Sequence, residues 1–268
     1  MEQKSPEEIK QAVLNRYSSH AQKRLAELEQ AAPSCCGAPQ ARVSETSSCC
    51  GETAAEADKN VVNALYGRED LAELPEDVLT SLGCGNPTAI AGLREGEAVL
   101  DLGSGGGLDC FLAAKRVGAG GSVVGLDMSG DMIQLARRNA GRIGIENVQF
   151  RLGEMEEMPF ADGTFDVIIS NCVINLSPDK DTVLREACRV LKPGGRLRAS
   201  DIVWTREPSA AERNDLASWT SCVAGALTEA DYAAKLRAAG FQDVRVEPKD
   251  GTPVGNLYSA NVSAEKNR

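Results

Sequence analysis

Histidine and positive charge are both scarce in this sequence. The 268-residue chain contains one histidine, His20, and sets 29 Lys and Arg against 39 Asp and Glu, a formal net charge of −10. A single histidine excludes a Cys2His2 zinc site, and any metal or metalloid site must depend on sulfur. The acidic balance repels phosphate backbones and anionic lipid, so we expect no nucleic-acid and no membrane partner.

Long apolar runs are missing as well. No run approaches the roughly 20 residues of a membrane span, and the charged N-terminus has no apolar centre of the kind found in signal peptides. We therefore expect a cytoplasmic protein. A chain of this length favours one main domain with a small appendage.

Cysteine, in contrast, is plentiful: the chain contains nine. Disulfides in the cytoplasm are mostly transient and catalytic, which makes thiol chemistry the leading question. Two near-repeats, "SCCGAPQ" and "SCCGETA", lie in a Ser-, Ala- and Gly-rich stretch over 31–58 that we expect to be a mobile arm without packed structure. A helix predicted over 6–30 precedes it, with an apolar stripe that needs a surface to cover.

The rest of the chain alternates strand and helix patterns, which indicates parallel strands joined by helical crossovers. Strands are predicted at 98–103, 122–127, 148–153, 165–170, 196–202, 241–247 and 257–264, and helices at 107–118, 129–143, 179–191 and 228–240. We predict an α/β fold with a doubly wound, mostly parallel seven-stranded sheet. The chain would consist of an N-terminal helix with a cysteine-rich arm (1–58) and a main domain (59–268), which contains a substrate-binding insertion at 203–227.

A nucleotide site is indicated directly after the first strand of the main domain. In "VLDLGSGGGLDC", Gly103, Gly105 and Gly107 allow a tight turn and a close approach of the backbone to a ligand. Asp127 ends the next strand, where a carboxylate can accept both hydroxyls of a ribose. These features fit NAD as well as S-adenosylmethionine. The alternative is that the glycines only make turns and Asp127 only caps a helix.

Three motifs together resemble the class I S-adenosylmethionine-dependent methyltransferases: D-x-G-x-G-x-G headed by Asp101, "GEME" at 153–156, and "RVLKPGGRL". The resemblance implies that the glycine loop receives the methionine part, that Asp127 holds the ribose, and that Glu154 and Met155 lie along the adenine. The cofactor-binding set that it implies is Tyr66, Asp101, Gly103, Ser104, Gly105, Asp127, Met128, Glu154, Met155 and Asn171.

Three cysteines have positions that suit a ligand site. Cys172 follows the strand at 165–170, and ligands of open parallel sheets bind outside the carboxyl ends of the strands. Cys84 and Cys222 lie in irregular segments rich in small residues, which can fold over those ends. Three thiolates would suit a soft, trigonal, thiophilic centre. Cys110 and Cys188 fall within apolar helix patterns and are interpreted as core fillers.

The chain more closely resembles the arsenite S-adenosylmethionine methyltransferases, from about residue 65 to 241. The segments that carry the likeness are "SLGCGNPTA", "DLGSGGG", "SNCVINL", "VLREACRVLKPGGR" and "CVAGAL". The family implies that Cys172 and Cys222 hold trivalent arsenic and that Cys84 ligates it or forms a transient disulfide. It also implies a role for an arm cysteine, which by position falls on Cys35 or Cys36, although Cys49 or Cys50 could serve.

The resulting hypothesis is a monomeric enzyme that transfers methyl groups from S-adenosylmethionine to arsenite, delivered as a thiol adduct, with glutathione or thioredoxin as reductant. An arsenic lone pair needs no general base, which agrees with the scarcity of histidine. The number of methyl groups and the acceptance of antimonite or bismuth stay open. Two alternatives also stay open: a methyltransferase for some other small metabolite with incidental cysteines, and a non-catalytic metalloid-binding protein.

Overall fold

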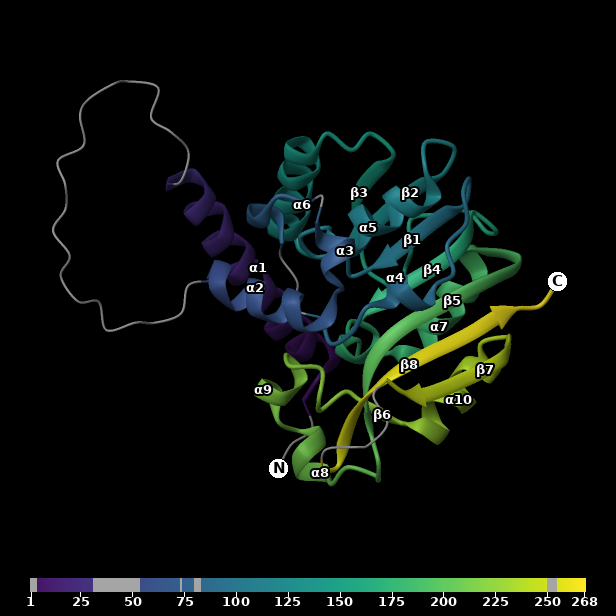
Figure 1. Cartoon of the computed structure of the whole chain (residues 1–268). Coiled ribbons are helices and arrows are strands. Elements are labelled where there is room, and N and C mark those ends of the chain that lie inside the picture. The colour runs from purple at the N-terminus through teal and green to yellow at the C-terminus, as the bar shows by residue number, and fades with distance from the viewer. Residues whose placement is uncertain (1–3, 31–53, 73, 80–82, 250–254) are drawn as a thin grey trace, which may run out of the picture.

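One twisted sheet forms the centre of the protein (Figure 1). The computed structural model describes residues 4–30, 54–72, 74–79, 83–249 and 255–268. The strand order is β3-β2-β1-β4-β5-β8-β7, with the short β6 paired to β5. Strands β1 to β5 pair in parallel, and β8 is antiparallel to both of its neighbours. The strands are β1 (Ala98–Leu102), β2 (Ser122–Asp127), β3 (Val148–Leu152), β4 (Phe165–Asn171), β5 (Leu191–Trp204), β6 (Leu227–Thr228), β7 (Phe241–Pro248) and β8 (Leu257–Lys266).

The main helices begin at the residues that the sequence marks as caps. The side chains of Ser129, Asp179 and Thr228 each accept a hydrogen bond from a backbone N–H of the first turn, which satisfies a donor that the helix leaves free. The helices are α1 (Pro6–Gln30), α2 (Ala54–Leu65), α3 (Arg68–Leu71), α4 (Pro87–Ile90), α5 (Leu108–Val117), α6 (Gly130–Ile143), α7 (Lys180–Val190), α8 (Ala210–Arg213), α9 (Leu216–Trp219) and α10 (Glu229–Ala238), with 3-10 turns η1 (Glu76–Val78) and η2 (Ile174–Leu176).

Both faces of the sheet are buried, as a doubly wound fold requires. Along β1, Leu100 and Leu102 face a core shared with α7 and α10, whereas Val99 faces a second core shared with α5. Alternate residues of one strand therefore pack on opposite sides. The predicted doubly wound, mostly parallel sheet is confirmed. Among the helices of the described ranges, none combines the length and apolar character needed to cross a membrane.

Helix α1 covers the carboxyl ends of the strands. Its Ala21 packs with Met132 and Leu135 of α6, and its Val13 packs with Cys172 and Cys222. Figure 1 shows α1 and α2 side by side along one edge of the domain. The apolar stripe predicted for residues 6–30 thus has its surface, which is α6 and the strand ends.

Two sequence expectations need correction, and a third lies outside the described residues. Helix α2 begins at Ala54, inside the 31–58 stretch that was expected to lack packed structure. The composition was misleading because Ala and Glu, which are common in low-complexity segments, are also good helix formers. Strand β5 extends through Trp204, so the insertion starts later than 203, and it contains the unpredicted α8, α9 and β6. Cys35, Cys36, Cys49 and Cys50 lie outside the described residues.

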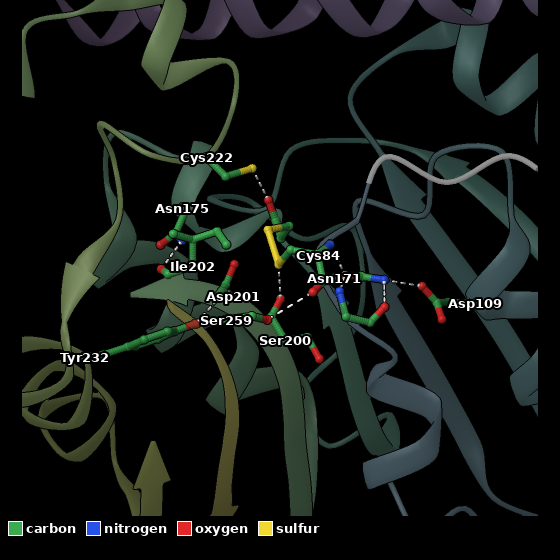
Figure 2. The surroundings of a disulfide bond; sticks show 12 residues. Cys84, Asp109, Asn171, Asn175, Ser200, Asp201, Ile202, Cys222, Tyr232 and Ser259 are labelled. Carbon is green, nitrogen blue, oxygen red and sulfur yellow. Dashed lines mark hydrogen bonds between the residues drawn. A yellow bond between two sulfur atoms is a disulfide. The ribbon is translucent and has the colours of Figure 1, made fainter. Parts of the chain in front are cut away.

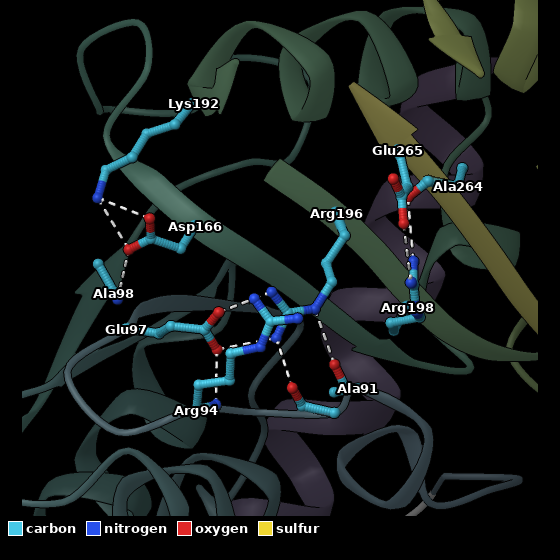
Figure 3. Close-up of polar contacts among 11 residues, drawn as sticks. Ala91, Arg94, Glu97, Ala98, Asp166, Lys192, Arg196, Arg198, Ala264 and Glu265 are labelled. Atoms are coloured by element: carbon cyan, nitrogen blue, oxygen red, sulfur yellow. Dashed lines mark hydrogen bonds and ion pairs between the residues drawn. The ribbon is translucent and has the colours of Figure 1, made fainter. Parts of the chain in front are cut away.

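A forked ion pair ties the approach to β1 onto β5 (Figure 3). The Arg196 guanidinium donates to both carboxylate oxygens of Glu97 at 2.7 and 2.8 Å and to the carbonyls of Ala91 and Gly92 at 2.8 Å. Burial acts to raise the pKa of Glu97, but the guanidinium overcomes that effect and holds the pKa below its usual value. Bidentate ion pairs of this kind, with little exposure to solvent, are among the stronger ion pairs in proteins.

We expect Arg196→Met to lower the free energy of unfolding by about 2–4 kcal/mol, because it leaves Glu97 buried without its partner. Urea unfolding measures the change. Lys192→Met, which removes the more exposed partner of Asp166, is the matched control and should cost less than about 1 kcal/mol. Since the pKa of Glu97 is depressed, the advantage of wild type exists above its unfolded pKa and should shrink as pH falls through the folded pKa. Equal losses in the two variants would contradict this account.

Candidate active site

A deep pocket opens at the carboxyl ends of β1, β2 and β4, where open parallel sheets bind their ligands. Its wall combines the glycine loop after β1, the end of β2, the turn after β3, the end of β4 and one face of α1. The lining residues include Lys10, Val13, Leu14, Tyr17, Gly103, Ser104, Gly105, Asp127, Met128, Met155, Asn171, Cys172 and Leu176.

The features around Asp127 suit a nucleoside. Its carboxylate accepts the backbone N–H groups of Gly105 at 2.9 Å and Ser129 at 2.8 Å, and burial raises its pKa. Gly103 and Gly105 have φ of 66° and 51°, a left-handed geometry that favours glycine. The buried Ser104 hydroxyl has no protein partner among the described residues. A carboxylate, a glycine cradle and a free hydroxyl in one pocket fit S-adenosylmethionine.

The structure separates the predicted cofactor residues into two groups. Seven of them line the pocket: Gly103, Ser104, Gly105, Asp127, Met128, Met155 and Asn171. Tyr66, Asp101 and Glu154 do not. The Tyr66 hydroxyl donates to Asp109 at 2.9 Å, Asp101 is buried in β1 beside the Cys110 thiol, and Glu154 pairs with Lys10 of α1 at 2.5 Å. The cofactor roles predicted for these three residues stay predictions.

Asn171 fixes the loop that carries Cys84 onto the end of β4. Its Oδ1 accepts the backbone N–H groups of Cys84 at 3.0 Å and Gly85 at 3.1 Å, while its Nδ2 lies 2.8 Å from the Gly85 carbonyl and 3.0 Å from Asp109. These bonds use the full capacity of the amide. A Cβ at Gly83 would collide with the same amide, so glycine is needed for this close approach.

Asp109 beneath this amide is buried, and burial raises its pKa to about 6 against the opposing hydrogen bonds from Asn171 and Tyr66. The Asp109 carboxyl, whose pKa is raised, thus supports the pocket floor through its hydrogen bond with Asn171. Asn171, predicted as a cofactor residue, therefore also has a clear structural part in positioning a thiol.

Cys84 and Cys172 form a disulfide in this structure (Figure 2). The Cys84 loop is held on its other side by the Ser259 hydroxyl of β8, which donates to the Cys84 carbonyl at 3.0 Å. The Cys172 N–H donates to the Ser200 carbonyl at 2.7 Å. Residues from three distant parts of the chain thus bring these two sulfur atoms together.

The third predicted thiol, Cys222, packs in the same apolar cluster. Its thiol donates to the Cys172 carbonyl, with 2.6 Å between sulfur and oxygen. Burial and the charge of Asp201 raise its pKa to about 12, although a hydrogen bond with Tyr17 and the charges of Arg16 and Lys180 oppose the rise. Cys222 is therefore a protonated thiol at neutral pH in this state.

The backbone at two of these cysteines adopts a rare conformation. Cys172 has φ of 62° and Cys222 has φ of 63°, and the only other non-glycine residue with positive φ in the described chain is Asp243. Such residues cost free energy and are concentrated at functional sites. Here the Cys172 sulfur is bonded to Cys84, and the Cys222 thiol lies against the Cys172 carbonyl.

The other free thiols lie elsewhere. Cys110 is fully buried, and burial raises its pKa; Cys188 is half-buried on α7 and packs against the main core. Within the described residues no three His, Cys, Asp or Glu side chains are arranged as a ready metal site. The disulfide accounts for this, because it occupies two of the three clustered sulfurs.

Sequence reasoning missed the contribution of α1 to the pocket. Lys10, Val13, Leu14 and Tyr17 all line it, and Tyr17 bonds to the thiol of Cys222. The available signal was the unexplained apolar stripe of this helix. Periodicity alone could not say which surface the stripe covers, since any apolar surface would satisfy it.

Comparison with known proteins agrees with this geometry. A family model described as a methyltransferase domain matches residues 93–240. An arsenite methyltransferase of Halobacterium salinarum is 44% identical over 92% of this chain and 61% of its own length, and one of Aquipseudomonas alcaligenes is 46% identical over 64% and 51%. The chain thus spans between half and two thirds of these two curated relatives.

The crystal structure of CrArsM, an arsenic(III) S-adenosylmethionine methyltransferase from Chlamydomonas reinhardtii, superposes with a TM-score of 0.65. It is 37% identical, over 75% of this chain and 73% of that one. The resemblance seen in the sequence motifs is confirmed, and the chain belongs to the arsenite methyltransferase family of methyltransferase-domain proteins.

Proposed function

We propose that this protein methylates trivalent arsenic, which Cys84, Cys172 and Cys222 hold as the substrate at the mouth of the S-adenosylmethionine pocket. One observation carries the proposal: the side chains of these three cysteines gather in one cluster, and Cys172 also lines the pocket that contains Asp127. The names of the relatives supply the substrate. The geometry supplies a place where a thiol-bound substrate and a nucleoside would meet.

When bound, S-adenosylmethionine supplies a methyl group activated by a sulfonium charge. Asp127 would hold its ribose, and the turn bearing Met155 would lie along its base. The three thiols bind arsenite by exchange: three S–H and three As–O bonds break, three As–S bonds form, and three waters leave. Arsenic keeps its lone pair, so no side chain has to remove a proton from the nucleophile.

The protein contributes positioning and exclusion of water. Helix α1 closes one side of the pocket with Val13, Leu14 and Tyr17. Holding two reactants in a fixed orientation can supply about 7–11 kcal/mol of the barrier. The left-handed backbone at Cys172 and Cys222 serves the same purpose, since it fixes two ligands before the substrate arrives.

A reductant must act before arsenite binds. The Cys84–Cys172 disulfide needs two electrons and two protons to give two thiols, and two thiols of glutathione or a thioredoxin would supply them as they become a disulfide themselves. A reducing compartment such as the cytoplasm would meet this requirement. The role predicted for an arm cysteine, Cys35 or Cys36, stays a prediction. Within the structure, the partner of Cys84 is Cys172.

The first test replaces one thiol ligand. Cys222→Ser should lower kcat/KM for arsenite by about 100-fold or more, because a hydroxyl is a poor ligand for a soft centre. The affinity for S-adenosylmethionine should change less than about twofold, since Cys222 does not line that pocket. Arsenic speciation over time measures the products. Cys188→Ser is the matched control on α7 and should behave as wild type.

Retained arsenite methylation in Cys222→Ser would favour a methyltransferase for another metabolite, with incidental cysteines. If the reduced wild-type protein binds arsenite tightly and yet releases no methylated product, a non-catalytic metalloid-binding protein is favoured instead.

Asp127→Asn should weaken S-adenosylmethionine binding by roughly 10- to 100-fold, because a charged hydrogen bond is worth about 1.5–3 kcal/mol. Calorimetry with the reduced protein measures this, and arsenite affinity should stay the same. Asp131→Asn, on the surface of α6, is the control. An unchanged affinity for the nucleoside would show that Asp127 serves only the backbone of the turn.

Asn171→Ala should raise the KM for arsenite by about tenfold, because it releases the loop that presents Cys84. Asn147→Ala removes another partly buried amide that bonds two carbonyls, far from the pocket, and controls for general loss of stability. The idea is rejected if the two variants lose stability equally and neither changes the KM.

A further inference from the structure

A second cavity adjoins the proposed active site. It lies between the start of α7, the segment from α8 to β6 and the first residues of α1, and it meets the cofactor pocket at Pro178, which lines both. Its lining comprises Lys4, Ile9, Pro178, Asp179, Lys180, Asp181, Arg213, Asn214, Trp219, Gly225, Leu227 and Lys235. Trp219 and Gly225 flank the turn that carries Cys222.

Four cations line this cavity, and three of them have carboxylate partners. Lys4 pairs with Glu8, Arg213 with Glu207, and Lys235 with Asp181. The fourth cation, Lys180, has different surroundings. All three paired cations are partly exposed, so their charges are also hydrated.

Lys180 is a buried ammonium without a carboxylate at ion-pair distance among the described residues. Only 7% of the residue is exposed. Its Nζ donates to the Ser177 carbonyl at 2.7 Å and stands 5.0 Å from the centre of the Trp219 ring. Burial lowers its pKa to about 8; the charge of Asp201 opposes this, and those of Arg213 and Lys235 add to it.

The charge of Asp201 offsets part of the cost of this arrangement, but no carboxylate of the described residues lies within ion-pair distance of Lys180. Burying an unpaired ion costs several kcal/mol, and the attraction to an aromatic ring returns about 0.5–2 kcal/mol. An ammonium has three donors, and one carbonyl uses only one of them. A lysine held this way at the wall of a cavity, with two donors left over, has the character of an anion-binding group.

We propose that this cavity binds the carboxylate of a small thiol that delivers arsenic to the three cysteines, with Lys180 as its anchor; the inference rests on the proposed function. The position selects this ligand. Trp219 lines the cavity, and its backbone carbonyl accepts the N–H of Cys222 at 3.0 Å, so the cavity borders the turn that carries this thiol. A molecule with its carboxylate at Lys180 would direct its sulfur toward this turn. In each exchange one As–S bond to the small thiol and the S–H bond of one cysteine break, while one As–S bond to that cysteine and the S–H bond of the released thiol form. Lys180 is a binding residue, not a catalytic one.

Binding can be tested without any turnover. S-Methylglutathione carries the carboxylates, but its blocked sulfur can neither ligate arsenic nor open the disulfide. Calorimetry with the full chain should detect binding to wild type and a loss of about tenfold or more in Lys180→Met. Lys180→Arg should retain part of the affinity. Lys192→Gln, which removes the same charge far from the cavity, should bind as wild type does.

A stability measurement protects against misfolding as an explanation. Without ligand, Lys180→Met should have an unfolding temperature equal to or above that of wild type, because it removes an unpaired buried charge. A merely structural lysine would give a less stable variant. A lower unfolding temperature of Lys180→Met would overturn the proposal. So would binding of S-methylglutathione by Lys180→Met with the affinity of wild type. The proposal also fails if inorganic phosphate competes with S-methylglutathione for wild type and binds with equal affinity.

Steady-state kinetics with two different thiols provide a third test. Lys180→Met should raise the KM about tenfold for arsenite supplied with glutathione, and should leave the KM unchanged for arsenite supplied with the uncharged 2-mercaptoethanol. An equal rise with both thiols overturns the proposal. If wild type binds S-methylglutathione through Lys180 but methylates no arsenical, the proposed function fails while the anion site stands.

Discussion

The side-chain amide of Asn171 is the contact on which the site depends. It lies at the last residue of β4 and bonds to both backbone N–H groups of the Cys84–Gly85 step, which is far away in sequence. Because Cys172 follows Asn171 directly, the amide that holds the loop also sets the distance between the two thiols. Ser200 on the neighbouring strand receives the Cys172 N–H, so the parallel pairing of β4 with β5 completes the frame. The chemistry is thus built on the ends of rigid strands, where loops of different origin can converge.

Much of this could be predicted from the sequence, and the reasons are local. Strand β2 was placed at its observed bounds, and β1 and β4 to within one residue, because buried strands produce short apolar runs closed by polar residues. Asp127 was identified by its place at the end of β2. The convergence of Cys84, Cys172 and Cys222 was suggested by the place of Cys172 at a strand end and by the irregular segments of the other two, whereas their roles as arsenic ligands came from the resemblance. The docking of α1, the positive φ of two cysteines and the Cys84–Cys172 pairing depend on tertiary contacts that short-range patterns do not contain.

The two adjoining cavities differ in electrical character, and this difference has a chemical use. Buried carboxylates adjoin the cofactor pocket: Asp109 and Asp127 line it, and Asp101 lies behind its wall, each with a raised pKa caused mainly by burial. A sulfonium is positively charged, so such a pocket favours the donor over its neutral product. The neighbouring cavity has the buried ammonium of Lys180 instead. A cationic donor and an anionic delivery molecule would therefore be sorted by charge before either meets the cysteines, within a chain whose net charge is −10.

The state of the thiols decides which centres the cluster could bind. In this structure two sulfurs are joined to each other, and the third is a thiol whose pKa is raised to about 12. Neither form binds a divalent cation well, because metal ligation needs thiolates. Arsenite differs, since each incoming thiol proton can leave with a hydroxyl of the substrate as water. Under the proposed function, the cluster would accept arsenite once the disulfide is reduced, because this substrate brings its own proton acceptor.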